Sequence, residues 1–249
     1  GSSVIGDVGR QFARRDRSMV KSELPPVGAV TKRLFDILVA TSSLMLLSPL
    51  IVLIALGVKL TSPGPVLFSH ARVGRGRTPF GCLKFRTMVE DAESWLQRDP
   101  HLNSVYLENG FKVPVGEDPR VTGFGRILRS THLDELPQLI NVIKGDLSIV
   151  GPRPIVIEEL DCFPRPDVDR LLSVRPGIFG LWTAMGQDRV NYPERAQVEL
   201  SYLDNRSVLF DLVILFRHVP VLLKGQPHDS PETRSKPSRL SNSLNPRSK

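Results

Sequence analysis

The chain has few cysteines and few aromatic residues, and both shortages narrow what it can be. Its two cysteines, Cys82 and Cys162, are too few for a disulfide framework and lack metal-site spacing, which favours a reducing compartment. Aromatic residues make up 6% of the chain and do not alternate with basic residues. A platform for single-stranded nucleic acid needs that alternation, so nucleic acid is not an expected partner.

Charged residues are missing from one long stretch. None lies between Asp36 and Lys59, where apolar side chains dominate, although charged residues make up 24% of the whole chain. As one helix, the segment from Ile37 to Val58 would measure about 33 Å, enough to cross a hydrocarbon core of about 30 Å. The sequence therefore predicts a membrane helix.

A proline stands near the middle of this apolar segment. Pro49 lacks an N–H and clashes with the carbonyl four residues earlier, so it predicts a bend, and Ser48 can satisfy groups freed there. Basic residues precede the segment at Lys32 and Arg33 and follow it at Lys59. Positive charge on both sides suits a helix-break-helix that enters and leaves by the cytoplasmic face. A kinked spanning helix fits the same residues, so the residues alone leave both topologies open.

The net charge of +7 and the pI near 9.7 indicate an anionic partner, such as anionic lipid or a phosphorylated small molecule. Composition changes divide the chain into four parts. These are a flexible basic segment at 1–31, the membrane helix at 32–60, a mixed domain at 61–225 and a disordered tail at 226–249.

The mixed domain predicts an α+β fold that is mostly helical. Strands joined by a Gly/Arg turn are expected at 66–74 and 80–88. Helices are expected at 89–98, 123–130, 137–145 and 194–205, with an irregular stretch at 99–118. The apolar segment 207–225 reads as a helix broken by Pro220, which could lie along a membrane surface or pack against the core.

An acid pair is the strongest chemical signal. Asp134 and Glu135 are adjacent, and Pro137 follows them at a position that a helix tolerates only in its first turn. Asp134 is therefore expected at or near a helix start, where it could cap the helix. Thr131 fits a capping position equally well, and the sequence does not choose between them.

Arginines surround this pair in the sequence. Arg126 and Arg129 precede it, and Arg153 lies between two prolines in a stiff, extended run. Guanidinium groups suit phosphate oxygens. Phosphoryl transfer could use such a set, with one carboxylate attacking phosphorus while a divalent cation and the arginines neutralise charge. Surface salt bridges among the same residues are the structural alternative.

Two further interpretations compete with phosphoryl transfer. Asp167 and Asp169 form a D-x-D, which resembles the metal-binding motif of nucleotide-sugar glycosyltransferases, although the motif is short and lies in a proline-flanked loop. A non-catalytic basic membrane adaptor is the other. His132 and His218 lack metal-ligand spacing.

Five motifs occur in a fixed order along the chain. They are KRLFD at 32–36, Ser48-Pro49, KFRTM at 84–88, LDELPQLINVIKGDLSIVGPRP at 133–154 and RPGIFGLW at 175–182. In this order they resemble the bacterial sugar transferase family, the monotopic phosphoglycosyl transferases, and within it the undecaprenyl-phosphate glucose or galactose phosphotransferases. The likeness runs from about Lys32 to Gly225, and the long central motif is highly specific.

The resemblance implies a reaction. A UDP-hexose, with glucose or galactose as the hexose, would donate hexose-1-phosphate to undecaprenyl phosphate and release UMP, through a covalent phosphosugar on Asp134 and with Mg²⁺. Glu135 would hold the metal with Asp134 or handle a proton. The phosphate-binding residues would be Arg129, Arg153, Lys84 and Arg86.

The resemblance also implies a location. Ser48 and Pro49 would make the membrane helix re-entrant, so that the small catalytic domain lies at the cytoplasmic face of the bacterial inner membrane, among phospholipids. The reaction would be the first membrane step of exopolysaccharide or related glycan assembly, and the family allows a homo-oligomer.

One stretch departs from the family pattern. Members often read RPGITGLWQVSGRN where this chain has RPGIFGLWTAMGQDR at 175–189. Thr183 replaces a glutamine, and Gln187 stands where an arginine is common. If this loop contacts the nucleotide or the sugar, either the donor preference would differ or the activity would be reduced.

Overall fold

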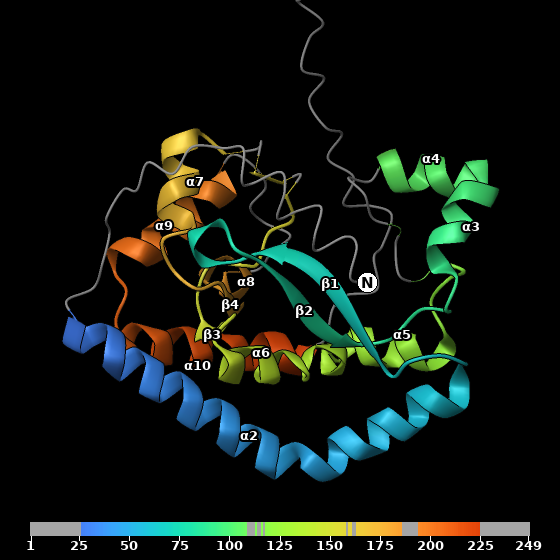
Figure 1. The fold of residues 1–249 in the computed structure, drawn as a ribbon, viewed down its shortest axis with the longest axis horizontal. Helices are drawn as coiled ribbons and strands as arrows, with labels where there is room; N and C mark the ends of the chain where they lie inside the picture. The colour runs from blue at the N-terminus through green and yellow to red at the C-terminus, as the bar shows by residue number, and fades with distance from the viewer. Residues whose placement is uncertain are drawn as a thin grey trace, which may run out of the picture.

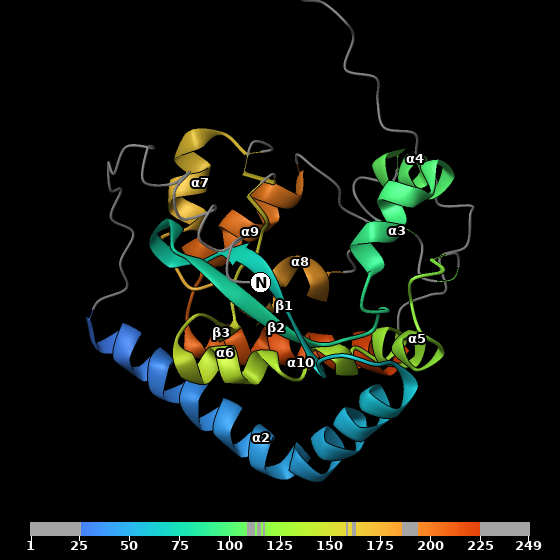
Figure 2. The same ribbon diagram turned by 45° about the vertical axis from the view of Figure 1, so that its right-hand side comes forward.

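The computed structural model has an α+β fold that is mostly helical, as predicted, with two small sheets among the helices (Figures 1 and 2). The residues it describes are 26–108, 113, 116, 118–157, 159–160, 163–185 and 194–224. The predictions for residues 1–25, for the tail at 226–249, and for Cys162 and Gln187 fall outside these residues.

The apolar segment forms one long helix, α2 (Pro26–Thr61), which Figure 1 shows bent beneath the rest of the domain. The helix begins before the predicted boundary at residue 32, so the prediction of a flexible segment is wrong for residues 26–31. The reason is local, because a proline is well tolerated in the first turn of a helix. By length and composition, residues 28–61 could cross a membrane.

The predicted hairpin is confirmed. Strands β1 (Leu67–Val73) and β2 (Pro79–Phe85) pair in antiparallel register and are joined by the 3-10 turn η1 (Arg75–Arg77). The second sheet pairs β3 (Ser148–Val150) with β4 (Gly177–Phe179) in parallel. A side chain at Gly177 would lie 2.0 Å from the Gly151 nitrogen, so glycine allows this close approach.

Helices surround these sheets. They are α3 (Ala92–Arg98), α4 (Pro100–Glu108), α5 (Gly123–Ser130), η2 (Leu133–Glu135), α6 (Gln138–Lys144), α7 (Arg165–Leu171), α8 (Leu181–Ala184), α9 (Glu194–Asp204) and α10 (Val208–Lys224). The four predicted helices are confirmed within a few residues as α3, α5, α6 and α9, and Gly145 ends α6 in the left-handed conformation that favours glycine.

Three local expectations are wrong. The stretch 99–118 is not irregular throughout, since α4 forms there and the Asp99 carboxylate accepts hydrogen bonds from the backbone N–H of His101 and Leu102. Pro220 does not break α10, because one proline near the end of a helix removes a single hydrogen bond that the other turns outweigh. Asp167 and Asp169 lie on helix α7 and not in a loop.

Both halves of α2 pack against the same domain. Near its start, Ala40 joins a buried cluster with Val142 of α6. Near its end, Ile54 packs with Phe85 of β2 and Leu128 of α5. The bend therefore brings the two halves of one helix against different parts of a single core.

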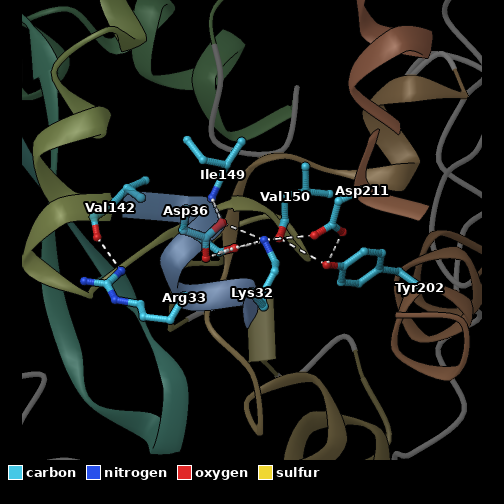
Figure 3. A network of polar contacts seen from close by, with 9 residues as sticks. Lys32, Arg33, Asp36, Val142, Ile149, Val150, Tyr202 and Asp211 are labelled. Carbon is cyan, nitrogen blue, oxygen red and sulfur yellow. Dashed lines mark hydrogen bonds and ion pairs between the residues drawn. The ribbon is translucent and has the colours of Figure 1, made fainter. Parts of the chain in front are cut away.

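A buried polar network fixes the first half of α2 (Figure 3). Lys32 Nζ lies 2.6 Å from Asp36 and 3.0 Å from Asp211 of α10. Asp36 also accepts hydrogen bonds from the Ser148 hydroxyl and the Ile149 N–H, while the Tyr202 hydroxyl donates to Asp211. The first and last residues of the KRLFD motif therefore anchor α2 to β3 and α10.

Candidate active site

The acid pair lies on η2, the short turn that joins α5 to α6. His132 enters this turn with a left-handed φ of 57°. The side chain of Asp134 is 9% exposed, whereas that of Glu135 is 33% exposed. Both helix-capping interpretations are wrong, because Pro137 occupies the cap position of α6 and the Thr131 hydroxyl donates to the Ile127 carbonyl within α5. The acid pair therefore has no capping role.

Lys84 of β2 reaches both carboxylates. Its Nζ lies 2.5 Å from Glu135 Oε1 and 3.9 Å from Asp134 Oδ2. The amide of Asn141, on α6, fixes this geometry by accepting from the Leu83 N–H at 2.9 Å and donating to the Gly81 carbonyl at 2.8 Å. Since these bonds dock α6 on the edge of β2 beside Lys84, they set the distance between lysine and acid pair.

The two carboxyl groups differ in their electrostatics. Burial raises the pKa of Asp134, and Lys84 opposes this rise in part. Burial would also raise the pKa of Glu135, but the ammonium of Lys84, together with Arg153, outweighs burial and lowers it. Adjacent carboxyl groups with pKa values moved in opposite directions are suited to different roles in one reaction.

Arg129 faces Asp134 from the last turn of α5. Its Nε donates to the Thr87 hydroxyl at 2.8 Å, and its charge acts to lower the pKa of Asp134. Burial lowers the pKa of Arg129, and Asp134 opposes this change, so the two groups stabilise each other's charge. Thr87 therefore orients the guanidinium of Arg129 through its Nε.

Arg153 contributes a further positive charge near Glu135, since it acts to lower the pKa of that carboxyl group. Its guanidinium lies 5.6 Å from the ring centroid of Trp182 on α8. The Gly177 N–H donates to the Pro152 carbonyl at 2.8 Å, which fixes the Pro-Arg-Pro segment against β4. The structure therefore brings Lys84, Arg129 and Arg153 around the acid pair.

Arg86 is used elsewhere. It is buried, and its guanidinium donates to the carbonyls of Ser62, at 2.7 Å, and Pro63, where the chain leaves α2. The hydrogen bonds described for Arg86 do not reach the acid pair, so the structure does not join it to the other predicted phosphate-binding residues. Its observed role is to hold the turn after the apolar helix.

The chemistry of the acid pair fits Mg²⁺. Within the described residues, no group of three or more His, Cys, Asp or Glu side chains forms a complete metal site. Mg²⁺ is commonly held by one or two carboxylates together with substrate phosphates, which is the donor set that Asp134 and Glu135 offer. Asp169 of the D-x-D motif instead pairs with Arg77 at 2.5 Å.

One cation near the pair was missed by sequence reasoning. Arg72 of β1 was not among the predicted phosphate-binding residues, yet its pKa responds to both Arg153 and Glu135. The signal that could have revealed it is the strand alternation, which sets Arg72 on the same face of the hairpin as Lys84.

The chain is similar to several known proteins. A family model described as "Bacterial sugar transferase" matches residues 27–225. The exopolysaccharide production protein ExoY of Rhizobium meliloti (strain 1021) is 42% identical over 198 residues, which cover 79% of this chain and 87% of that protein. The undecaprenyl-phosphate galactose phosphotransferase of Salmonella typhimurium (strain LT2) is 42% identical over 198 residues, which cover 78% of this chain and 40% of that protein. The UDP-glucose:undecaprenyl-phosphate glucose-1-phosphate transferase of Caulobacter vibrioides is 38% identical over 210 residues, covering 80% and 73%.

Proposed function

The chain belongs to the bacterial sugar transferase family and is a phosphoglycosyl transferase, and from this premise we propose that it transfers hexose-1-phosphate from a UDP-hexose to undecaprenyl phosphate. Glucose and galactose are the proposed hexoses, and UMP is the released product. The reaction would be the first membrane step of exopolysaccharide or related glycan assembly. The observation that carries the proposal is the acid pair, with Asp134 buried and Glu135 half-buried, among the cations Lys84, Arg129 and Arg153.

The proposed reaction has two displacements at one phosphorus atom. A carboxylate oxygen of Asp134 attacks the phosphorus bonded to the sugar, and the bond from that phosphorus to the bridging oxygen breaks, so that UMP leaves with the electron pair. A phosphate oxygen of undecaprenyl phosphate then attacks the same phosphorus. The bond to Asp134 breaks, which restores the carboxylate and yields undecaprenyl diphosphate hexose.

The surrounding residues supply positioning and charge. Lys84 holds Glu135 at 2.5 Å and keeps it ionised, while it leaves Asp134 at 3.9 Å free to reach the substrate. Arg129 and Arg153 would stabilise the negative charge on the transferred phosphate and on the leaving group. When bound by Asp134, Glu135 and the donor phosphates, Mg²⁺ would supply further neutralisation of that charge.

We propose a re-entrant topology for α2. Near its start, Arg33 donates to the carbonyls of Val142 and Ile143 on α6, and near its end Gly57 lies against the Phe124 ring of α5. A helix that spanned a hydrocarbon core of about 30 Å would have its ends on opposite sides, and one domain could not contact both. Contacts at both ends therefore support entry and exit through the cytoplasmic face of the bacterial inner membrane.

The exposed apolar residues support contact with phospholipid. Met45 and Leu46, at the bend of α2, are 74% and 80% exposed. On α10, Leu209 and Phe216 are 74% and 75% exposed, whereas Ile214 on the opposite face is buried. Figure 2 shows α10 at the height of α6, above α2. An amphipathic α10 in this position suits the membrane interface.

The proposal is tested by identifying the released nucleotide. Full-length protein with Mg²⁺, undecaprenyl phosphate and a panel of UDP-hexoses should release UMP, and Asp134→Asn should abolish release. Without the acceptor, label from the sugar phosphate should stay on the wild-type protein and not on the variant. Asp167→Asn serves as the control that keeps activity.

Two outcomes would replace the proposal. Release of UDP, lost in the Asp167→Asn variant, would indicate the glycosyltransferase alternative. Liposome binding that survives loss of both Asp134 and Glu135, with no turnover of any donor by the wild type, would indicate a membrane adaptor.

A further inference from the structure

Arg72 shares one face of the hairpin with Lys84. In the β1–β2 register Arg72 pairs with Phe80, His70 with Cys82, and Phe68 with Lys84. Cross-strand partners lie on the same face, as do residues two apart along one strand. Arg72 and Lys84 are therefore on one face, with Cys82 between them. Because burial raises the pKa of the Cys82 thiol to about 11, the thiol itself carries no charge at neutral pH.

The other edge of β1 brings Arg153 close to Arg72. The Val73 N–H donates to the Ile155 carbonyl at 3.0 Å, so the Pro-Arg-Pro segment runs beside the end of β1. A terminal nitrogen of Arg72 donates to the Pro154 carbonyl at 3.4 Å, next in sequence to Arg153. The two arginines thus approach each other from neighbouring segments.

This arrangement leaves positive charge in excess. Burial lowers the pKa of Arg72, and the charge of Arg153 lowers it further, while Glu159 acts in the opposite direction. Glu135 already pairs with Lys84 at 2.5 Å. Two half-buried guanidinium groups that repel each other, with Glu159 as a partial counter-charge, favour the binding of a further anion.

We propose that Arg72 and Arg153 together bind the nucleotide-side phosphate of the donor, and that Arg129 serves the sugar-side phosphate. This inference rests on the proposed function. In-line displacement requires the leaving group to lie opposite the attacking oxygen. Arg129 is held on α5 by Thr87, whereas Arg72 lies on β1 and contacts the Pro-Arg-Pro segment beside it. The two groups of cations therefore come from different elements, as two consecutive phosphates would require.

If Arg72 binds the nucleotide-side phosphate, its substitution should impair only the first displacement, because UMP has left before undecaprenyl phosphate attacks. In Arg72→Ala, KM for the UDP-hexose and the inhibition constant of UMP should both rise about tenfold or more, because a charge-assisted contact to phosphate is lost. KM for undecaprenyl phosphate should stay within about twofold. Arg72→Lys, which keeps the charge, should recover part of the loss.

A matched control tests whether the effect is specific. Arg170 is another arginine of the domain, exposed and paired with Asp204 at 2.5 Å, and Arg170→Ala should leave all three constants unchanged. A fall in kcat with unchanged UMP inhibition, or equal losses for both substrates, would reduce Arg72 to a structural support of the Pro-Arg-Pro segment and overturn the inference.

Direct titration with UMP separates this inference from the proposed function. UMP should bind the wild-type protein and bind Arg72→Ala about tenfold more weakly. If the wild type binds UMP in this way but turns over no UDP-hexose, the proposed function fails and the phosphate site stands. If it releases UMP from a UDP-hexose but Arg72→Ala binds UMP as tightly as the wild type does, the site fails and the function stands.

Discussion

The hydroxyl of Ser48 donates a 2.8 Å hydrogen bond to the carbonyl oxygen of Met45, four residues before Pro49. In a regular helix this carbonyl would accept a hydrogen bond from the N–H of residue 49, which proline lacks. Ser48 therefore satisfies the acceptor that the bend exposes. The arrangement suits a lipid environment, where an unsatisfied carbonyl costs several kcal/mol.

Ser48→Ala should destabilise the protein without touching its chemistry. Removing the hydroxyl leaves the Met45 carbonyl unpaired at an exposed apolar bend, at a cost of roughly 1–3 kcal/mol. The expected result is a lower melting temperature in lipid nanodiscs, with activity retained below the transition. Ser42→Ala, another exposed serine of α2, is the matched control, and an equal change in both variants would contradict this role for Ser48.

The fold was predictable where local chemistry decides the structure. Gly145 ends α6 because its φ of 94° favours glycine, and the hairpin follows from strand-forming runs around a Gly/Arg turn. Ser48 was predicted to satisfy groups freed at Pro49, and its hydrogen bond confirms this. Each of these decisions depends on residues a few positions apart.

The parts that escaped prediction depend on contacts between distant segments. Asp36 meets Ser148 and Ile149 across more than a hundred residues, so no local pattern identifies it as an anchor of α2. Arg86 follows Lys84 by two residues in the same motif, a spacing that would place both side chains on one face of a strand. Because β2 ends at Phe85, Arg86 lies beyond the strand and donates instead to the carbonyls that follow the apolar helix. Local sequence locates the acid pair, but it does not show that Arg86 is used elsewhere or that Arg72 lies near the pair.

Lys84→Met should shift the activity of the enzyme toward higher pH. Lys84 acts to lower the pKa of both Asp134 and Glu135, so both values should rise when its charge is lost. Activity near neutral pH should fall roughly ten- to hundredfold and recover in part as pH increases, since the nucleophile must be ionised. The pH dependence of kcat/KM tests this, and Lys84→Arg should keep the acidic limb near its original position. A uniform loss at all pH values would contradict the electrostatic role.

Asp134→Asn should stabilise the protein while it abolishes turnover. Because burial raises the pKa of Asp134, the folded state binds a proton more tightly than the unfolded state does, and the wild type loses stability as pH rises from the unfolded pKa through the folded one. The neutral amide removes that loss, so the melting temperature at neutral pH should rise by roughly 2–4 °C. Melting curves at acidic and neutral pH test the sign, because the gain should shrink in acid. A lower melting temperature at neutral pH would show that the carboxylate is stabilised by its neighbours more than burial destabilises it.

Pro49→Ala should test whether the bend sets the membrane topology. With the missing N–H restored, α2 could form a straight helix, and residues 28–61 are long and apolar enough to cross a bilayer. Single cysteines introduced at the exposed positions Val30 and Thr78, in a Cys162→Ser background with buried Cys82, report on the two flanks of α2. In intact cells, both positions of the Pro49 protein should resist a membrane-impermeant thiol reagent, and one of them should become reactive in a fraction of the Pro49→Ala molecules. Reaction of one of the two cysteines in the protein that keeps Pro49 would mean that α2 spans the membrane. Arg33 and Gly57 could not then both contact the same domain.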